Sequence, residues 1–323
     1  MIITVTLNTA VDKTLAVPNF RLGRRHRTVE QTTTPGGKGV NVARLLKTLG
    51  QPVIATGFAG GATGARIVDQ LTQLSVLSDF VRIRDESRTN TAVIDPTTGE
   101  QTEINERGPA VTLPEIEAFS EKLLYLAQGA SMCVFAGSLP RQVEVDVYAR
   151  LIPELRRLGV STLIDTDGDP LRRAVRAEPD VISPNVLEAE ELVGHEFNDE
   201  EDHAIAVREM VELGAREAIM TVDDGCFALM EGEEGLTGGP ALYRVRGPKL
   251  EPRATVGSGD AFLAGFVAAR YQGRAPAECL RYGVAVGVES TQHLGAGIVD
   301  PGRLERMLAE VVVERPAIPA EVG

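Results

Sequence analysis

Short runs of β-branched and other apolar residues alternate with longer amphipathic stretches, and this alternation restricts the fold more than any other feature of the chain. The runs are typical of strands and the amphipathic stretches of helices. Several runs are apolar at consecutive positions, as expected for strands covered by helices on both faces. We therefore predict an α/β fold with a mostly parallel sheet, with strands at Ile2–Leu7, Val53–Thr56, Met132–Ala136, Thr162–Ile164, Val181–Ser183 and Ala218–Val222 and helices near 64–77, 114–127, 143–158 and 201–213.

Two segments interrupt the alternation, at about 11–34 and 88–107. Both are polar and rich in Thr, Arg and Glu, and they can form a separate small sheet. Because both flank candidate ligand residues, a lid over a binding site is one interpretation. Ordinary solvated hairpins are the other, and on the sequence alone we favour them slightly.

Composition excludes several classes of function. The chain has 323 residues, of which 43% are hydrophobic, enough for a large core. Its net charge of −13 argues against a general binder of nucleic acid or anionic membranes. No apolar run reaches transmembrane length. Three cysteines without C-x-x-C spacing, Cys133, Cys226 and Cys279, suit core positions in a reducing cytosol. We expect a cytoplasmic protein with small-molecule ligands.

A glycine-rich turn precedes a helical pattern late in the chain, at Thr255-Val256-Gly257-Ser258-Gly259-Asp260-Ala261-Phe262. Small residues let the main chain approach a ligand, and the unpaired N–H groups of a helix start can hold a phosphate or a developing oxyanion. Asp260 lies beside that anion as a candidate base. An ordinary N-capping Asp is the alternative, and the turn alone favours neither.

A second glycine-rich turn opens another predicted helix, at Gly36-Gly37-Lys38-Gly39-Val40-Asn41. Its backbone can contact a polar ligand, with Lys38 and Asn41 as donors to hydroxyls or phosphate. The spacing matches neither a Walker A loop nor G-x-G-x-x-G. A plain strand-to-helix turn is the competing interpretation.

Other polar residues are ambiguous when taken singly. Asp12 can accept hydrogen bonds from sugar hydroxyls or can form a turn. Asn185 and Glu188, three apart at a helix entry, can share a hydrated divalent cation, although capping is favoured by the spacing. Cations that can clamp a phosphate, or that form a solvated face, are Arg24, Arg25, His26, Arg27 and Arg88. The four histidines lack metal-ligand spacing, which disfavours zinc chemistry.

Taken together, these motifs resemble the ribokinase/PfkB carbohydrate kinase family over about residues 1–300. The similarity extends to its 1-phosphofructokinase and tagatose-6-phosphate kinase branch. The residues that carry it are Asp12, Gly36-Gly37-Lys38-Gly39-x-Asn41, Asn185-x-x-Glu188 and Gly257-Ser258-Gly259-Asp260, with Thr4-Val5-Thr6-Leu7-Asn8, Arg88-Thr89-Asn90, Thr102-Glu103-Ile104-Asn105 and Gly137-Ser138-Leu139-Pro140 for the branch.

The resemblance implies a ribokinase-like three-layer α/β/α core, formed by 1–10, 35–87 and 108–323, with a small discontinuous β-sheet lid from 11–34 and 88–107. It further implies transfer of the γ-phosphoryl group of ATP, with Mg²⁺, to a phosphosugar hydroxyl. We expect fructose 1-phosphate as the acceptor, with tagatose 6-phosphate or fructose 6-phosphate as alternatives and a non-catalytic phosphosugar sensor as the alternative of another class. The resemblance also suggests a homodimer formed through the lid.

Roles for individual residues follow from the resemblance alone. Asp260 is the catalytic base, and Gly257, Ser258 and Gly259 complete the anion hole. The substrate-binding residues are Asp12, Gly36, Gly37, Lys38, Asn41, Arg88, Ser138 and Arg27. The nucleotide-binding residues are Asn185, Thr221, Gly225, Gly257 and Gly259, with Glu188 at the metal. Two positions depart from the family pattern: Ser183 replaces a frequent lysine, and Thr221-Val222-Asp223-Asp224-Gly225 replaces Ser-Leu-Gly-x-x-Gly.

Overall fold

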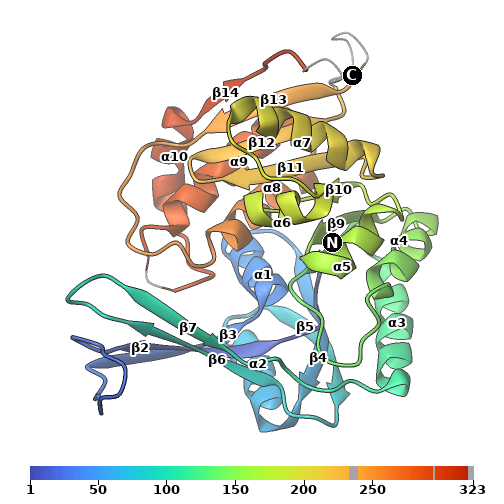
Figure 1. The fold of residues 1–323 in the computed structure, drawn as a ribbon. Coiled ribbons are helices and arrows are strands. Elements are labelled where there is room, and N and C mark those ends of the chain that lie inside the picture. Colours follow the sequence, from blue (N-terminus) through green and yellow to red (C-terminus); the bar gives the residue numbers. More distant parts are fainter. Residues whose placement is uncertain (233–238, 294, 319–323) are drawn as a thin grey trace.

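Two separate sheets organise the molecule (Figure 1). The computed structural model describes residues 1–232, 239–293 and 295–318. Within these residues the large sheet has ten strands, in the order β14 (Val312–Glu314), β13 (Ala241–Arg246), β12 (Gly225–Met230), β11 (Glu217–Val222), β10 (Val181–Ile182), β9 (Ser161–Asp165), β8 (Met132–Ala136), β1 (Ile2–Thr6), β4 (Val53–Gly60) and β5 (Leu77–Ile83).

The strands from β5 to β11 pair in parallel, which confirms the expected mostly parallel sheet. Strands β12, β13 and β14 extend it with antiparallel pairs that the sequence pattern did not predict. Strand β5 was also missed, because the helix expected to reach residue 77 ends at Gln73. Ser75, with a φ of 57°, stops helical continuation, and Leu77 then begins β5.

Helices cover both faces of the large sheet, and alternate residues of β1 show the two cores. Ile2 packs into one core, whereas Ile3 and Val5 pack into the other. The first core receives residues from α1 (Lys38–Thr48), α2 (Gly61–Gln73), α8 (Ser258–Tyr271), α9 (Pro276–Ser290) and α10 (Pro301–Glu310). The second receives residues from α3 (Leu113–Ala127), α4 (Val147–Arg157), α5 (Gly168–Val175), α6 (Val186–Val193) and α7 (Glu200–Glu212). The three-layer α/β/α arrangement is confirmed.

The two segments that interrupted the alternation form the small sheet, which projects from the core in Figure 1. Its strands lie in the order β3 (Glu30–Gly36), β2 (Ala10–Ala16), β6 (Arg88–Ile94) and β7 (Gln101–Asn105). Two antiparallel hairpins, β2–β3 and β6–β7, join through a parallel pair of β2 with β6. That pair sets Asp12 opposite Asn90. The expected hairpins and the expected separate sheet are therefore both present.

The order of the strands places the loops that follow the parallel strands at one edge of the large sheet. The chain builds β1, β4 and β5 outward, then returns to place β8 on the other side of β1. Open α/β sheets bind ligands at the carboxyl ends of their strands near such a reversal.

Among the described helices, none has the length and apolar character needed to cross a bilayer.

Candidate active site

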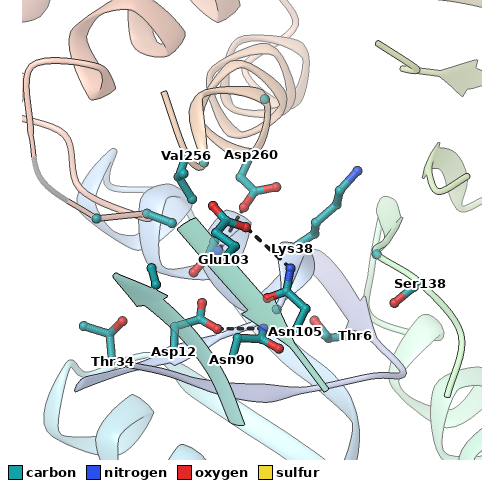
Figure 2. Close-up of a pocket in the computed structure, with 18 of the residues that line it drawn as sticks. Thr6, Asp12, Thr34, Lys38, Asn90, Glu103, Asn105, Ser138, Val256 and Asp260 are labelled. Atoms are coloured by element: carbon teal, nitrogen blue, oxygen red, sulfur yellow. Dashed lines mark hydrogen bonds between the residues drawn. The ribbon is translucent and has the colours of Figure 1, made fainter. Parts of the chain in front are cut away.

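A cavity of about 560 Å³ lies between the carboxyl ends of the large-sheet strands and the small sheet. One side of it is lined by Asn8, two residues after β1, and by the residues that directly follow β8, β9 and β10: Gly137, Thr166 and Ser183. The small sheet lines the other side with residues of all four of its strands. Figure 2 shows Asp12, Asn90, Glu103 and Asn105 of that sheet gathered below Asp260. Elements far apart in the sequence thus share one hollow.

Asp260 lies in the first turn of α8, three residues after the N-cap Gly257. The φ of Gly257 is 81°, a conformation that favours glycine. The side chain of Asp260 is buried, and Asn41 Nδ2 of α1 donates to its Oδ2 at 2.9 Å. In a first helical turn the N–H groups of Gly259 and Asp260 have no intrahelical acceptor. Gly257 and Gly259 line the cavity beside Asp260. The turn therefore offers a carboxylate and backbone donors to the same space.

The environment of Asp260 favours its protonated form. Burial, reinforced by the negative charge of Asp165, raises the pKa of Asp260 to about 7. Lys38 and the Asn41 hydrogen bond act in the opposite direction, and Asp12 adds a smaller upward shift. A carboxyl group with a pKa near neutrality exchanges protons readily at physiological pH, as a general base must.

Asp12 of β2 lies on the floor of the cavity, where Asn90 Nδ2 of β6 donates to its Oδ1 at 2.9 Å. Burial raises the pKa of Asp12, against the lowering effects of Asn90 and Arg88. Gly36 lies directly under this carboxylate: a Cβ on Gly36 would lie 2.0 Å from Asp12 Oδ2. Gly36 therefore makes room for Asp12 and does not itself line the cavity. The Asp12 and Asn90 pair presents acceptors and donors suited to sugar hydroxyls.

Lys38 begins α1 and directs its ammonium away from Asp12 and Asp260 (Figure 2). Its Nζ donates to Asp165 Oδ1 at 2.8 Å and to Glu188 Oε1 at 3.5 Å. Both carboxylate side chains are mostly buried, with exposures of 8% and 15%. These neighbours outweigh desolvation and raise the pKa of Lys38. Although Lys38 lines the cavity, its charge is already paired.

Asn185 and Glu188 form the capping box that the spacing favoured. Asn185 Oδ1 accepts from Glu188 N, and Glu188 Oε2 accepts from Asn185 N, so both side chains fix the start of α6. Both also line the cavity, beside Thr221 at the end of β11. Among the described residues no group of three or more His, Cys, Asp or Glu gathers as a metal site.

Mg²⁺ at a phosphate site is commonly held by one or two carboxylates together with substrate oxygens and water. Asp165 and Glu188 already share one cation, the Lys38 ammonium, within the cavity. Burial and the negative charge of Asp165 raise the pKa of Glu188 although Lys38 lowers it, so a further positive charge would favour the ionised form of Glu188. The chemistry of this pair therefore fits a divalent cation accompanied by phosphate oxygens.

Arg88 and Ser138 meet at the junction of the two sheets. Asn8 connects them, because its Nδ2 donates to Ser138 Oγ at 3.3 Å and its carbonyl accepts from Arg88 Nε at 3.2 Å. Arg88 also donates to Glu106 O at 3.0 Å. Both Arg88 and Ser138 line the cavity. A guanidinium and a hydroxyl thus converge where an anionic group of a ligand can bind.

Most of the expected site residues line this cavity, and four do not. The cavity as described includes Asp12, Gly37, Lys38, Asn41, Arg88, Ser138, Asn185, Glu188, Thr221, Gly257, Gly259 and Asp260. Of the four outside it, Gly36 makes room for Asp12. The Ser258 N–H is used within the turn, where it donates to Thr255 O at 3.2 Å. Arg27 is exposed in the β2–β3 connection, and Gly225 packs against Val245 of β13.

Several residues of the cavity were missed. Asp165 ends the strand predicted at Thr162–Ile164, and its place at a carboxyl edge was the signal that could have found it. Glu103, Asn90 and Asn8 fall in motifs that were recognised without a role for these side chains. Ala296 comes from the loop after α9, which no sequence pattern identified.

Comparisons with known proteins agree with this geometry. The family model described as pfkB family carbohydrate kinase matches residues 5–302. A 1-phosphofructokinase of Borreliella burgdorferi is 31% identical over 314 residues, covering 97% of this chain and 98% of that protein. A tagatose-6-phosphate kinase of Staphylococcus epidermidis is 30% identical over 317 residues, covering 97% and 99%.

Solved structures extend the similarity to three dimensions. The phosphofructokinase-2 of Escherichia coli, crystallised in complex with substrates and products, matches with a TM-score of 0.88 at 27% identity, covering 95% of this chain and 98% of that one. The ribokinase-like fold expected from the sequence is thereby confirmed.

Proposed function

Because the chain belongs to the pfkB family of carbohydrate kinases and is a sugar-phosphate kinase, we propose that it phosphorylates fructose 1-phosphate to fructose 1,6-bisphosphate with ATP. In this reaction a hydroxyl oxygen of the sugar attacks the γ-phosphorus. The bond from that phosphorus to the β–γ bridging oxygen breaks, and ADP leaves. The hydroxyl proton must pass to a base on the enzyme.

Asp260 is that base, and the observation that carries the proposal is its setting. It is a buried carboxylate with a pKa of about 7, within the cavity that also contains the Asp12 and Asn90 pair. A base of this kind contributes roughly 10²- to 10⁴-fold to the rate. Asp12 and Asn90 hold the sugar hydroxyls, and Gly37 and Asn41 complete the sugar site.

The turn before α8 stabilises the transferring group. Phosphoryl transfer depends mainly on alignment and on neutralising charge at the equatorial oxygens. The free N–H groups of Gly259 and Asp260, at the positive end of the helix dipole, supply that neutralisation next to the base. Loss of one such donor typically costs roughly 10²- to 10³-fold. Ser258 belongs to this turn through its backbone.

The nucleotide binds along the ends of β10 and β11. Asn185 and Thr221 line that part of the cavity, and Glu188 with Asp165 would hold Mg²⁺. When bound, Mg²⁺ neutralises the phosphate oxygens during transfer. Gly225 supports this region from the β11–β12 turn. Asp224 of that turn accepts two hydrogen bonds from Arg244 Nη2, at 2.6 Å and 2.8 Å, which restrain a turn whose Asp223 stands where the family pattern has glycine.

The substrate's own phosphate binds at Arg88 and Ser138, and Arg27 assists from the exposed β2–β3 connection of the lid. The division of the chain follows from these roles. The core carries the base and binds the nucleotide, and it is formed by residues 1–10, 35–87 and 108–323. The lid carries Asp12, and it is formed by residues 11–34 and 88–107. Closure of the lid excludes water, which competes with the sugar for the γ-phosphate.

Two further features complete the proposal. The β2–β3 connection exposes Leu22 and Val29, and all of β7, with Ile104, is exposed, which supports a homodimer formed through the lid. Light scattering of Ile104→Lys against the unchanged protein tests this, since loss of the dimer is expected.

Three free buried thiols support a cytoplasmic location.

A substrate panel tests the function. ADP release is measured with fructose 1-phosphate, fructose 6-phosphate, tagatose 6-phosphate and fructose, in parallel with thermal unfolding of the protein with each sugar. We expect the highest kcat/KM with fructose 1-phosphate, supported by Asn105 in the cavity and the named 1-phosphofructokinase relative. A higher value with tagatose 6-phosphate would replace the substrate and keep the mechanism. Thermal stabilisation without turnover would make the protein a phosphosugar sensor and defeat the proposal.

A further inference from the structure

Arg44 of α1 is half-buried behind the cavity and joins three separate pieces of chain. Its Nη1 lies 3.3 Å from Pro35 O, 3.4 Å from Asn41 Oδ1 and 3.3 Å from Ala296 O. Pro35 precedes the sugar-binding turn, Asn41 is the partner of Asp260, and Ala296 belongs to the loop after α9. Arg44 itself does not appear among the described residues that line the cavity.

The contact with Asn41 determines which way its amide faces. A guanidinium only donates hydrogen bonds, so the Asn41 atom that faces Arg44 must be the oxygen. The Asn41 amide nitrogen is then directed to Asp260, where it donates to Oδ2 at 2.9 Å. A rotated amide would direct its oxygen at a carboxylate oxygen, and two acceptors repel. Arg44 therefore fixes the one orientation that supports the base.

The contact with Ala296 connects Arg44 to the loop that packs against the start of α8, the helix that carries Asp260. The next residue, Gly297, has a φ of 75°, and a Cβ there would lie 2.7 Å from Arg44 Nη1. The loop therefore fits closely around the guanidinium. Ala296 in turn packs on the N-cap of α8, since a Cβ on Gly257 would lie 2.6 Å from Ala296 Cβ. Arg44 thus contacts both the partner of Asp260 and the loop that supports its turn.

We propose that Arg44 is a positioning residue for phosphoryl transfer, which orients Asn41 toward Asp260 and fixes the Ala296 loop against the anion-holding turn. It acts through these residues and touches neither sugar nor nucleotide. The inference rests on Asp260 being the base, as proposed above. Small displacements of a base cost up to about 10²-fold in rate, so the effect falls on kcat.

The test compares Arg44→Met and Arg44→Lys by kinetics over a range of pH. Without Arg44 the Asn41 oxygen loses its donor, so only Asp260 still orients the amide; the hydrogen bond to Asp260 is less well held and the pKa of Asp260 rises. The charged groups that face Asp260 from the neighbouring elements, Asp165, Lys38 and Asp12, remain in every variant. Arg44→Met also removes a positive charge that lowers the pKa of Asp12, and Arg44→Lys keeps that charge. We expect kcat of Arg44→Met to fall roughly 10- to 100-fold, with the KM for ATP unchanged within about twofold. The fall of kcat/KM at low pH, which we call its acid limb, moves to higher pH.

Arg44→Lys keeps a positive charge and one donor, so we expect its acid limb to lie between those of Arg44→Met and the unchanged enzyme. Lys47→Met, an exposed cation on the same helix, is the matched control and leaves both measures unchanged. If Arg44→Met does not fold, the acid limb of Arg44→Lys decides the question. An unmoved acid limb overturns the inference, whether or not kcat falls. Because Asp260→Asn is measured alongside, an active Asp260→Asn separates failure of the proposed base from failure of this inference.

Discussion

Lys38 Nζ donates to Asp165 Oδ1 at 2.8 Å, so the lysine expected at the sugar is paired with a carboxylate at the end of β9. The same ammonium reaches Glu188 Oε1 at 3.5 Å. Lys38 therefore links the glycine-rich turn at the start of α1 to the carboxylates proposed for the metal. The Lys38 ammonium also balances negative charge near Asp260, whose pKa it lowers.

Asp260→Asn is expected to abolish turnover while the fold is kept. The amide accepts no proton, so kcat falls by roughly 10²- to 10⁴-fold. The oxygen of the new amide can still accept the hydrogen bond of Asn41, which preserves local packing. Steady-state ADP release measures the loss, and circular dichroism checks the fold. A variant with a near-normal rate would remove Asp260 from the mechanism.

The same variant is expected to be more stable than the unchanged protein at alkaline pH. Folded Asp260 keeps its proton up to about pH 7, whereas the unfolded carboxyl releases it near about 3.9. Since the folded state binds more protons between these values, this group contributes less stability as pH rises toward 7. The amide has no such cost. The Tm difference between variant and unchanged protein should therefore widen from pH 5 to pH 8, and an equal difference at both contradicts the assigned shift.

Activity of the unchanged enzyme is expected to fall below about pH 7, because only the carboxylate form of Asp260 accepts a proton. The negative charge of Asp165 raises the pKa of Asp260, so Asp165→Asn should move the acid limb of kcat/KM to lower pH. The pH profile of kcat/KM measures both effects. A limb that stays in place in Asp165→Asn shows that Asp165 does not act on the base through its charge.

Lys38→Met is expected to destabilise the protein, and more so at pH 8 than at pH 5. Burial raises the pKa of Glu188, and the ammonium offsets this. Without Lys38 that pKa rises further, so stability is lost as pH rises through it. Because the Lys38 side chain is 38% exposed, solvent screening limits the effect to roughly 1 kcal/mol. Thermal unfolding at both pH values measures it, and Lys38→Arg, which keeps the charge, serves as the control.

Gly36→Ala is expected to weaken sugar-phosphate binding without affecting the nucleotide. The new methyl group would lie 2.0 Å from Asp12 Oδ2 and must displace that carboxylate. We expect a roughly 10- to 100-fold loss in kcat/KM for the sugar phosphate and an unchanged KM for ATP. Gly129→Ala, where a methyl group meets nothing within 4 Å, is the matched control. Equal kinetics for the two variants would separate Asp12 from substrate binding.

The sequence was sufficient for the parallel strands other than β5 and for most of the cavity, because both depend on local pattern. Apolar runs predict buried strands, and glycine turns before helices predict where backbone meets ligand. Long-range pairing was not accessible in this way. Strand β12 is itself a buried apolar run that the pattern could have identified, whereas the antiparallel pairing of β12, β13 and β14 follows from contacts outside any local pattern.

Side-chain partners were the other limit. The position of Lys38 in a glycine turn predicts a donor, but its actual acceptors, Asp165 and Glu188, lie 127 and 150 positions away. Arg44 appears in the sequence as an ordinary polar residue of a helix. Its role depends on Ala296, which lies 252 positions later. Such contacts follow from the packing of α1 against α8 and the loop after α9, and no local pattern contains them.

The hydrogen bond from Asn41 to Asp260 spans 219 positions. During synthesis, a chain that has emerged only as far as β13 already carries the turn with Asn41 but has no carboxylate opposite it. Under the proposed mechanism such a nascent chain transfers no phosphoryl group before α8 has packed against α1. Proteolytic removal of α8 and the segment after it has the same result, since the remaining fragment lacks Asp260.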